Sequence, residues 1–374
     1  MFILYLLFLL PVSLISIYFY KALKNSISIF GGDFASRRMR ILIAILAFSF
    51  SFFAFDINGF GTVIVLYVFI FSILTNIFGF ILKLVFRTKF INGFRFWKCL
   101  NASFVIPLVL TGVFVVLGYY NMNNVIKTEY TVATDKNIRD EGYKIGLIAD
   151  VHYGISLDVE ELNRKCKEIG ENRLDVLILC GDIVDDNASK SDIEEVFSEL
   201  SNIKTNFGIF YTYGNHDRQI YRKERAYTEE ELAEVITSYG IKILRDDVVK
   251  INDEFWLAGR EDRGYKAIER MDVSKLLSGV DHRDFILTAD HQPNQYKENS
   301  KAGTDLLLSG HTHGGQLWPA NLFLDIVKFN DANYGMYDLD EDSKAIVTSG
   351  FAGWGFPIKT ASPAEYVVIN VIPK

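Results

Sequence analysis

The 374-residue sequence predicts two unlike parts: an N-terminal region of four membrane-spanning helices and a C-terminal α/β domain. The first observation is a change of composition near residue 121, since apolar and small residues dominate before it and most Asp, Glu and Lys residues follow it. The second is a series of short apolar runs, separated by charged stretches with helical periodicity, in the remainder. We therefore expect a membrane anchor over 1–121, a linker with the first strand over 122–142, and a domain over 143–374.

The anchor contains four apolar stretches close to the roughly 20 residues that a helix needs to cross a bilayer. They cover residues 2–23, 41–57, 61–86 and 100–120. No Lys or Arg precedes the apolar core of the first stretch, which argues against a cleaved signal peptide. A buried helix of a soluble protein explains any one stretch, but four in succession predict a multi-pass integral membrane protein.

Basic residues predict the orientation of this anchor. The connections after the first and third stretches are basic, whereas the turn after the second carries no Lys or Arg and only Lys127 follows the fourth for some distance. The basic residues of the two connections are Lys21, Lys24, Arg37, Arg38 and Arg40, and Arg87, Lys89, Arg95 and Lys98. Because short basic loops stay in the cytoplasm, the C-terminal domain is expected on the exoplasmic side.

Charge and cysteine content exclude two classes of protein. A net charge of −7 without a basic cluster is not that of a nucleic-acid-binding protein. The three cysteines, Cys99, Cys166 and Cys180, have no paired spacing and do not form a disulfide framework.

Seven strands are predicted from near-continuous apolar runs, the pattern of strands buried on both faces. They cover residues 143–149, 176–180, 209–213, 285–288, 305–308, 345–348 and 366–371. Amphipathic helices are predicted between them over 159–170, 190–200 and 228–239. This alternation predicts layers of helices on sheets.

Side chains of the types that bind divalent metals directly follow five of these strands. The motifs are Asp150-Val151-His152, Gly181-Asp182, Gly214-Asn215-His216-Asp217, Asp290-His291 and Gly310-His311-Thr312-His313. Five of the six histidines fall in these motifs, and His282 is the exception. One histidine after a strand is commonly structural, but five together predict a metal site, because sites in α/β sheets gather at the carboxyl ends of strands.

In this order the five motifs resemble the calcineurin-like metallophosphoesterase superfamily, whose pattern is D-x-H, G-D, G-N-H-D, H and G-H-x-H. The motifs extend over Asp150–His313, and later segments are similar to the membrane-anchored bacterial branch of the family. Those segments are Tyr334, Ser349-Gly350, Phe356-Pro357-Ile358-Lys359 and Pro363-Ala364-Glu365. The resemblance implies a four-layer αββα sandwich for the soluble domain.

The resemblance also implies two divalent metal ions, Mn, Fe or Zn, about 3.5 Å apart. It assigns Asp150, His152 and His313 to one ion, Asn215, His291 and His311 to the other, and Asp182 to both as a bridge. His216 is expected over the substrate phosphate as the group that protonates the leaving group, with Asp217 orienting its imidazole. A hydroxide that bridges the two ions is expected to attack phosphorus in line.

Three interpretations concern residues beside these motifs. For Asp185 and Asp186 two interpretations are open, electrostatic support of the site and starting or capping the helix that begins at Lys190, and the second is favoured. Asp290 either supports the metal ligands or is solvated, and the solvated interpretation is favoured. Lys359 stands where the branch often has Arg, and because Lys offers no bidentate contact, a phosphate contact is not assigned to it.

These interpretations predict a metal-dependent phosphoester hydrolase of the phosphodiesterase or pyrophosphatase type. A lipid-linked or envelope phosphate is the expected substrate, because a tethered domain meets lipid headgroups at high effective concentration. The expected partners are thus the lipid bilayer and a phosphorylated substrate, without nucleic acid. A phosphomonoesterase or nucleotidase is the alternative of the same class, and a catalytically idle metal-binding membrane sensor is the alternative of another class.

Overall fold

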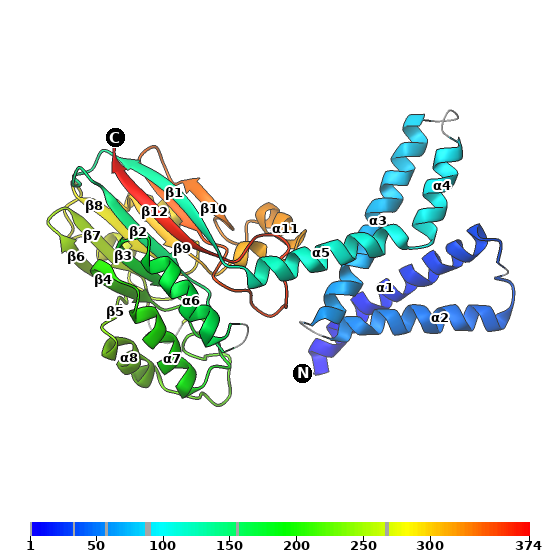
Figure 1. Ribbon diagram of the computed structural model, residues 1–374, viewed down its shortest axis with the longest axis horizontal. Helices are drawn as coiled ribbons and strands as arrows, with labels where there is room; N and C mark the ends of the chain where they lie inside the picture. Colours follow the sequence, from blue (N-terminus) through cyan, green and yellow to red (C-terminus); the bar gives the residue numbers. More distant parts are fainter. Residues whose placement is uncertain (1, 33, 57–58, 87–90, 155–156, 266–268) are drawn as a thin grey trace. The chain divides into compact units, whose positions relative to one another are not determined.

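The computed structural model describes residues 2–32, 34–56, 59–86, 91–154, 157–265 and 269–374, without the side chains of residues 2–10, 86 and 91–94. The chain forms two compact units (Figure 1). The first consists of Met1–Leu117 with Gly355–Pro357, and the second of Gly118–Trp354 with Ile358–Lys374.

Helices make up the first unit, and the last of them continues into the second. They are α1 (Phe2–Ile29), α2 (Arg37–Phe52) with the 3-10 turn η1 (Phe53–Phe55), α3 (Phe60–Phe86), α4 (Ile91–Ala102) and α5 (Val105–Asn123). In the described part of the chain, three helical segments are long and apolar enough to cross a membrane: Arg37–Phe55, Phe60–Val85 and Val105–Asn123. These three helices fit the expected N-terminal membrane region.

The predicted count of four spans is corrected to three candidates. The first predicted span, residues 2–23, is helical as part of α1, but α1 is not among the candidates. Residues 2–10 lie outside the described side chains, and from Pro11 onward Lys21, Lys24 and Asn25 interrupt the apolar sequence. The remainder of α1 is thus too polar to qualify by composition.

The last span begins later than predicted. Residues 100–102 belong to α4, and α5 starts at Val105. Between the two helices Phe104 adopts a left-handed backbone conformation with φ of 59°. A non-glycine residue in this region ends a right-handed helix, so the apolar run 100–120 is divided where hydropathy alone shows no break.

Two six-stranded sheets form the core of the second unit, as far as its residues are described. The first sheet has the order β1-β12-β2-β3-β4-β5 and the second the order β10-β11-β9-β8-β7-β6. The strands are β1 (Ile126–Thr134), β2 (Tyr143–Ile148), β3 (Leu174–Cys180), β4 (Thr205–Thr212), β5 (Lys242–Ile243), β6 (Asp247–Asn252), β7 (Phe255–Gly259), β8 (Phe285–Ala289), β9 (Leu306–Ser309), β10 (Gly335–Asp338), β11 (Lys344–Val347) and β12 (Glu365–Pro373). Both sheets are mixed, because β12 pairs antiparallel with β2, β10 with β11, and β6 with β7.

The two sheets pack face to face, with helices on their outer faces. Alternate residues of β2 and β3, such as Leu147 and Ile178, meet Leu257 of β7 and Leu308 of β9 in a buried apolar layer. On the other face of the first sheet lie α6 (Val159–Gly170), α7 (Lys190–Ser201) and α8 (Glu229–Ser238). The short helices α9 (Val273–Leu276) and α10 (Tyr296–Lys301) cover the second sheet. The α/β sandwich expected of this half of the chain is therefore confirmed.

All seven predicted strands are present, with ends shifted by a few residues. The strands β5, β6, β7 and β10 are absent from the prediction, and β1 lies in the segment expected to hold a linker and a first strand. Within the first sheet β2, β3 and β4 run parallel, and within the second β7, β8 and β9 do so. The carboxyl ends of parallel strands share one edge of a sheet, which places the loops with the metal-binding motifs together.

Candidate metal centre

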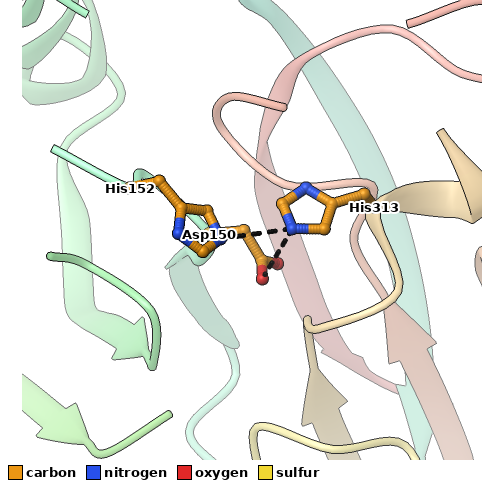
Figure 2. A group of neighbouring side chains, drawn as sticks. All are labelled: Asp150, His152 and His313. Carbon is orange, nitrogen blue, oxygen red and sulfur yellow. Dashed lines mark hydrogen bonds and ion pairs between the residues drawn. The ribbon is translucent and has the colours of Figure 1, made fainter. Parts of the chain in front are cut away.

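Six of the predicted ligands form two groups at the ends of these strands. Each residue offers one ligand atom, and within a group these atoms lie within 4.8 Å of one another. The groups are Asp150, His152 and His313, and Asp182, His291 and His311. In the first group the Nε2 atoms of His152 and His313 are 3.2 Å apart, and Nε2 of His313 lies 3.6 Å from Oδ1 of Asp150 (Figure 2). Loops distant in sequence thus bring their side chains to one point.

Asp182 lies between the two groups. Its Oδ2 atom is 3.0 Å from Nε2 of His291 in its own group and 3.9 Å from Nε2 of His152 in the other. Its second oxygen, Oδ1, accepts a hydrogen bond from the backbone N–H of His216 at 2.8 Å. The whole residue is only 1% exposed. This is the position that a carboxylate needs in order to face two cations at once.

Three of the imidazoles are held with one ring nitrogen toward the protein and the other toward the centre. Nδ1 of His291 lies 2.8 Å from the carbonyl oxygen of Cys180, and Nδ1 of His313 lies 3.2 Å from that of Ala352. Nδ1 of His152 lies 3.3 Å from Oδ2 of Asp185. An acceptor at Nδ1 fixes the tautomer whose Nε2 carries a free lone pair, which is the usual arrangement behind a metal-binding histidine.

Five of the predicted ligands have a left-handed backbone conformation. Their φ angles are 54° for Asp150, 45° for His152, 51° for Asp182, 71° for His311 and 50° for His313. Residues with a side chain adopt this region rarely, at a cost of roughly 1–3 kcal/mol each, and such strain clusters at functional sites. The backbone therefore turns sharply at these residues after each strand. The stability of the surrounding fold offsets the conformational free energy that these turns cost.

Asp217 holds two of the strand-end loops together. Its buried carboxylate accepts hydrogen bonds from the backbone N–H groups of Asp182, Ile183 and Val184 after β3 and of Gly214 after β4, at 2.6–3.1 Å. The prediction that Asp217 orients the His216 imidazole is wrong. The residue acts on the backbone that presents Asp182.

Asp186 takes the position predicted for Asp217. Its Oδ2 atom contacts Nδ1 of His216, and both residues line a cavity of about 440 Å³ together with Asp182, Asn215, Tyr221, His311, His313 and Trp354. The His216 ring centroid lies 5.0 Å from that of Trp354 and 5.3 Å from that of Tyr221. His216 thus stands at the wall of an accessible cavity next to the two groups.

The charges of the site divide its residues into cationic and neutral imidazoles. Burial alone would lower the pKa of His216, but the hydrogen bond to Asp186 and the charge of Asp182 raise it to about 9. Burial, with His291 nearby, lowers the pKa of His311 to about 4. Burial also lowers the pKa of His313 well below its usual value. His311 and His313 are therefore neutral near pH 7 and offer lone pairs, whereas the charge of Asp182 raises the pKa of His291 against the effect of burial, as acidic neighbours raise that of His216. A cation bound at Nε2 of His291 would take the place of that proton, and the proton of His216 stays available for donation.

The donor set fits two divalent cations. Within the described residues, Oδ1 of Asn215 and Nε2 of His291 are buried side-chain atoms without a hydrogen-bond partner, although His291 forms an ion pair with Asp182. Buried polar atoms normally have partners, so these atoms indicate ligands of a bound ion. Carboxylate, imidazole and amide donors suit Mn, Fe or Zn alike. The residues present therefore match the dinuclear site.

The comparison with protein families agrees with this geometry. The family model for calcineurin-like phosphoesterases matches residues 143–315. This domain is a calcineurin-like metallophosphoesterase. It is thus a metal-dependent hydrolase that acts on phosphoester bonds, and the predicted enzyme class is confirmed at this level.

Some relatives of this metallophosphoesterase are named as transmembrane proteins. An uncharacterized metallophosphoesterase of Campylobacter jejuni is 28% identical over 280 residues, which cover 73% of this chain and 70% of the relative. The "transmembrane protein with metallophosphoesterase domain" of Danio rerio is 29% identical over 286 residues, or 72% of this chain. The match spans 62% of the Danio rerio protein, less than two thirds of its length. A dimetal phosphatase structure from Danio rerio has a TM-score of 0.41 at 13% identity and covers 62% of this chain and 94% of that one.

Two interpretations of residues beside the motifs are corrected. Asp185 and Asp186 do not cap the helix after them, because Ser189 caps α7 in a capping box with Asp192. Asp290 is not solvated: it is 1% exposed and forms an ion pair with Arg270. In each case the carboxylate has a partner that is distant in sequence, which local spacing does not reveal.

Lys359 stabilises the loop whose carbonyl oxygen faces the metal-binding residue His313. It is fully buried, and Nζ contacts the carbonyl oxygens of Ser349 and, at 3.3 Å, of Ala352, the same oxygen that faces Nδ1 of His313. Burial lowers the pKa of this lysine to about 8. Lys359 therefore holds the loop behind His313, in keeping with the absence of an assigned phosphate contact.

The sequence interpretation missed Asp262, a buried carboxylate near the second group. Oδ1 accepts a hydrogen bond from Nε2 of Gln292 at 2.8 Å, while Oδ2 has no partner. Burial raises the pKa of Asp262 to about 6, and the charge of Asp182 adds to this effect. The signal was available, because Asp262 follows the apolar run of β7 as the other motifs follow their strands.

We expect the substitution Gly310→Ala to reduce metal content. An added Cβ would lie 2.5 Å from Oδ2 of Asp150 and 2.7 Å from Cβ of Ala149, so Asp150 must move. Elemental analysis of the purified full-length protein should then show fewer than two ions per chain, with a lower melting temperature. Gly279→Ala, which meets nothing within 4 Å, is the matched control. Full metal content in Gly310→Ala would contradict the close packing around Asp150.

Proposed function

We propose that the protein is a membrane-anchored phosphodiesterase or pyrophosphatase-type hydrolase with two divalent cations, acting on a lipid-linked or envelope phosphate. The position of Asp182 supports the dinuclear part most directly, because this buried carboxylate faces imidazoles of both groups. The tether supports the substrate class, since a domain joined to membrane-crossing helices meets lipid phosphates at high effective concentration. The bilayer and a phosphorylated lipid are thus the proposed partners, and nucleic acid is not one.

The ligand assignment follows the two groups. Asp150, His152 and His313 would hold one ion, His291, His311 and the amide oxygen of Asn215 the other, and Asp182 both. Bound divalent cations lower the pKa of water and neutralise phosphoryl oxygens. The protein holds these donors out of water on strained strand ends, so that little rearrangement is needed when a phosphate enters.

His216 is proposed as the general acid. Asp186 contacts Nδ1, which leaves Nε2 as the ring nitrogen for a substrate in the cavity. With a pKa raised to about 9, the ring is protonated at neutral pH and can donate its proton to the oxygen of the leaving group. Trp354 and Tyr221 lie beside the ring and would restrict the position of the substrate's leaving group in the cavity.

The basic connections support an exoplasmic active site. If the connection before α2 and the one after α3 stay in the cytoplasm, α5 crosses outward and releases the domain on the other side. Arg87 and Lys89 of the second connection lie outside the described residues.

The substitution His216→Ala should lower turnover by roughly 10²–10⁴-fold, the usual worth of a general acid. The full-length protein in detergent, loaded with Mn²⁺ and given a chromogenic phosphodiester, provides the assay. Metal content should remain that of the wild type, since His216 is not a proposed ligand. Unchanged turnover would refute the acid role, and a wild-type protein that binds two ions without hydrolysing any phosphoester would favour the idle sensor.

The substitution Asp186→Asn should move the alkaline limb of the pH–rate profile to lower pH. The protonated imidazole is the active form, so activity is lost as pH rises through the pKa of His216. Removal of the Asp186 charge lowers that pKa, and the loss then begins earlier. Asp158→Asn, at the exposed cap of α6, should leave the profile unchanged. A profile that keeps its limb in Asp186→Asn would show that Asp186 does not position the acid.

Cysteine labelling in intact cells tests the topology. In a Cys99→Ser background the two remaining cysteines are buried. A membrane-impermeant maleimide should label Glu224→Cys in the domain without lysis and Ala35→Cys, before α2, only after permeabilisation. The reverse pattern would place the domain in the cytoplasm.

A further inference from the structure

The helix α11 (Ala320–Val327) exposes an apolar face that nothing in the described structure covers. None of its residues is buried, and Ile326 is 78% exposed. Phe329, just after the helix, is 73% exposed. The exposed apolar side chains of this segment are Leu322, Phe323, Ile326, Val327 and Phe329. A contiguous exposed apolar group of this kind marks an interaction surface.

The base of α11 is built onto the last metal-binding motif. The helix begins seven residues after His313, and Gly315 of the same turn lies so close that a Cβ there would be 2.5 Å from Cβ of Asn321. At the other end Asp325 accepts a hydrogen bond from Asn333, whose carbonyl oxygen accepts one from the hydroxyl of Thr312. The helix is thus fixed to the loop that carries His311 and His313, with its apolar side chains outward.

The segment Lys359–Thr360 connects the same base to the end of a candidate membrane-crossing helix. The backbone N–H of Lys359 donates to the carbonyl oxygen of Gly118 in the last turns of α5 at 2.9 Å. The next residue, Thr360, donates its N–H to the carbonyl of Gln316 at 2.8 Å and accepts from the N–H of Trp318 at 2.9 Å. A short chain of contacts within the second unit therefore joins the exit of α5 to the root of α11.

If the candidate span α5 crosses the bilayer, its exit marks the level of the membrane interface. With 19 residues at about 1.5 Å each, α5 is about 28 Å long, close to the roughly 30 Å of the hydrocarbon core. The whole helix is needed to cross, so its last turn lies at the interface. Tyr119 and Tyr120 in that turn are exposed, as aromatic residues at a membrane boundary commonly are. A segment rooted beside this turn is within reach of lipid headgroups.

We propose that α11 and Phe329 form a membrane-contact surface, with Phe323 and Ile326 inserted among the lipids of the leaflet where α5 emerges. An amphipathic helix with apolar residues on one side lies in such an interface. The bilayer is the occupant because the chain itself brings this helix to it. Under the proposed function, this contact turns the His311–His313 loop toward phosphates in the headgroup layer.

Lipid-dependent quenching tests the contact directly. The full-length Cys99→Ser protein carries a polarity-sensitive fluorophore at Ile326→Cys and is placed in nanodiscs of phosphatidylcholine and phosphatidylglycerol. Lipids with a doxyl group near the headgroup should quench this label at least twofold. The same label at Ile372→Cys, at the end of β12 and 39% exposed, is the control and should not respond. Equal, weak quenching at both positions would overturn the proposal, as would a blue-shifted label at 326 that doxyl lipids do not quench, since a protein partner or second copy then covers the face.

Activity separates this inference from the proposed function. The double substitution Phe323→Glu and Ile326→Glu changes exposed side chains outside the metal centre. It should lower kcat/KM for a phosphodiester lipid in vesicles at least tenfold and leave hydrolysis of a soluble chromogenic diester unchanged. An equal effect on both substrates, or none on either, would contradict the membrane role. Failure of the wild type to hydrolyse either substrate would refute the proposed function, and the quenching result would still decide the contact.

Discussion

The site depends on one buried carboxylate that faces two sets of imidazoles. Asp182 lies 3.0 Å from His291 and 3.9 Å from His152 in regions from which water is excluded. A buried charge is costly unless it is paired, and here Asp150 and Asp262 add further acidic groups at the same place. Burial raises the pKa of both. Bound cations would balance this concentration of negative charge, and the left-handed backbone conformations bring the carboxylates together for them.

Much of the metal centre was predictable because its ligands lie in short sequence motifs that directly follow buried strands. Near-continuous apolar runs identified β2, β3, β4, β8 and β9, and each is followed by His, Asp or Asn. Parallel strands bring their carboxyl ends to one edge, so the motifs had to converge if the strands paired as expected. Spacing along the chain did not decide which atoms meet, but the number of histidines in equivalent places made a dispersed arrangement improbable.

The residues that support the ligands were the harder part. The partner of His216 is Asp186 and not its neighbour Asp217, because the Asp217 carboxylate accepts hydrogen bonds from backbone N–H groups of another loop. Asp290 pairs with Arg270 twenty positions earlier in the chain. Such contacts depend on the fold as a whole. Short strands such as β5 carry too little pattern to detect, and α11 breaks the rule that apolar helix faces turn inward.

Anomalous X-ray scattering from crystals of the full-length protein loaded with Mn²⁺ tests the central claim most directly. Two peaks should appear, one among Asp150, His152 and His313, the other among Asn215, His291 and His311, with the carboxylate of Asp182 between them. A single peak, or a pair of peaks that does not share Asp182, would contradict the account, because the buried carboxylate would then have no cation on one side.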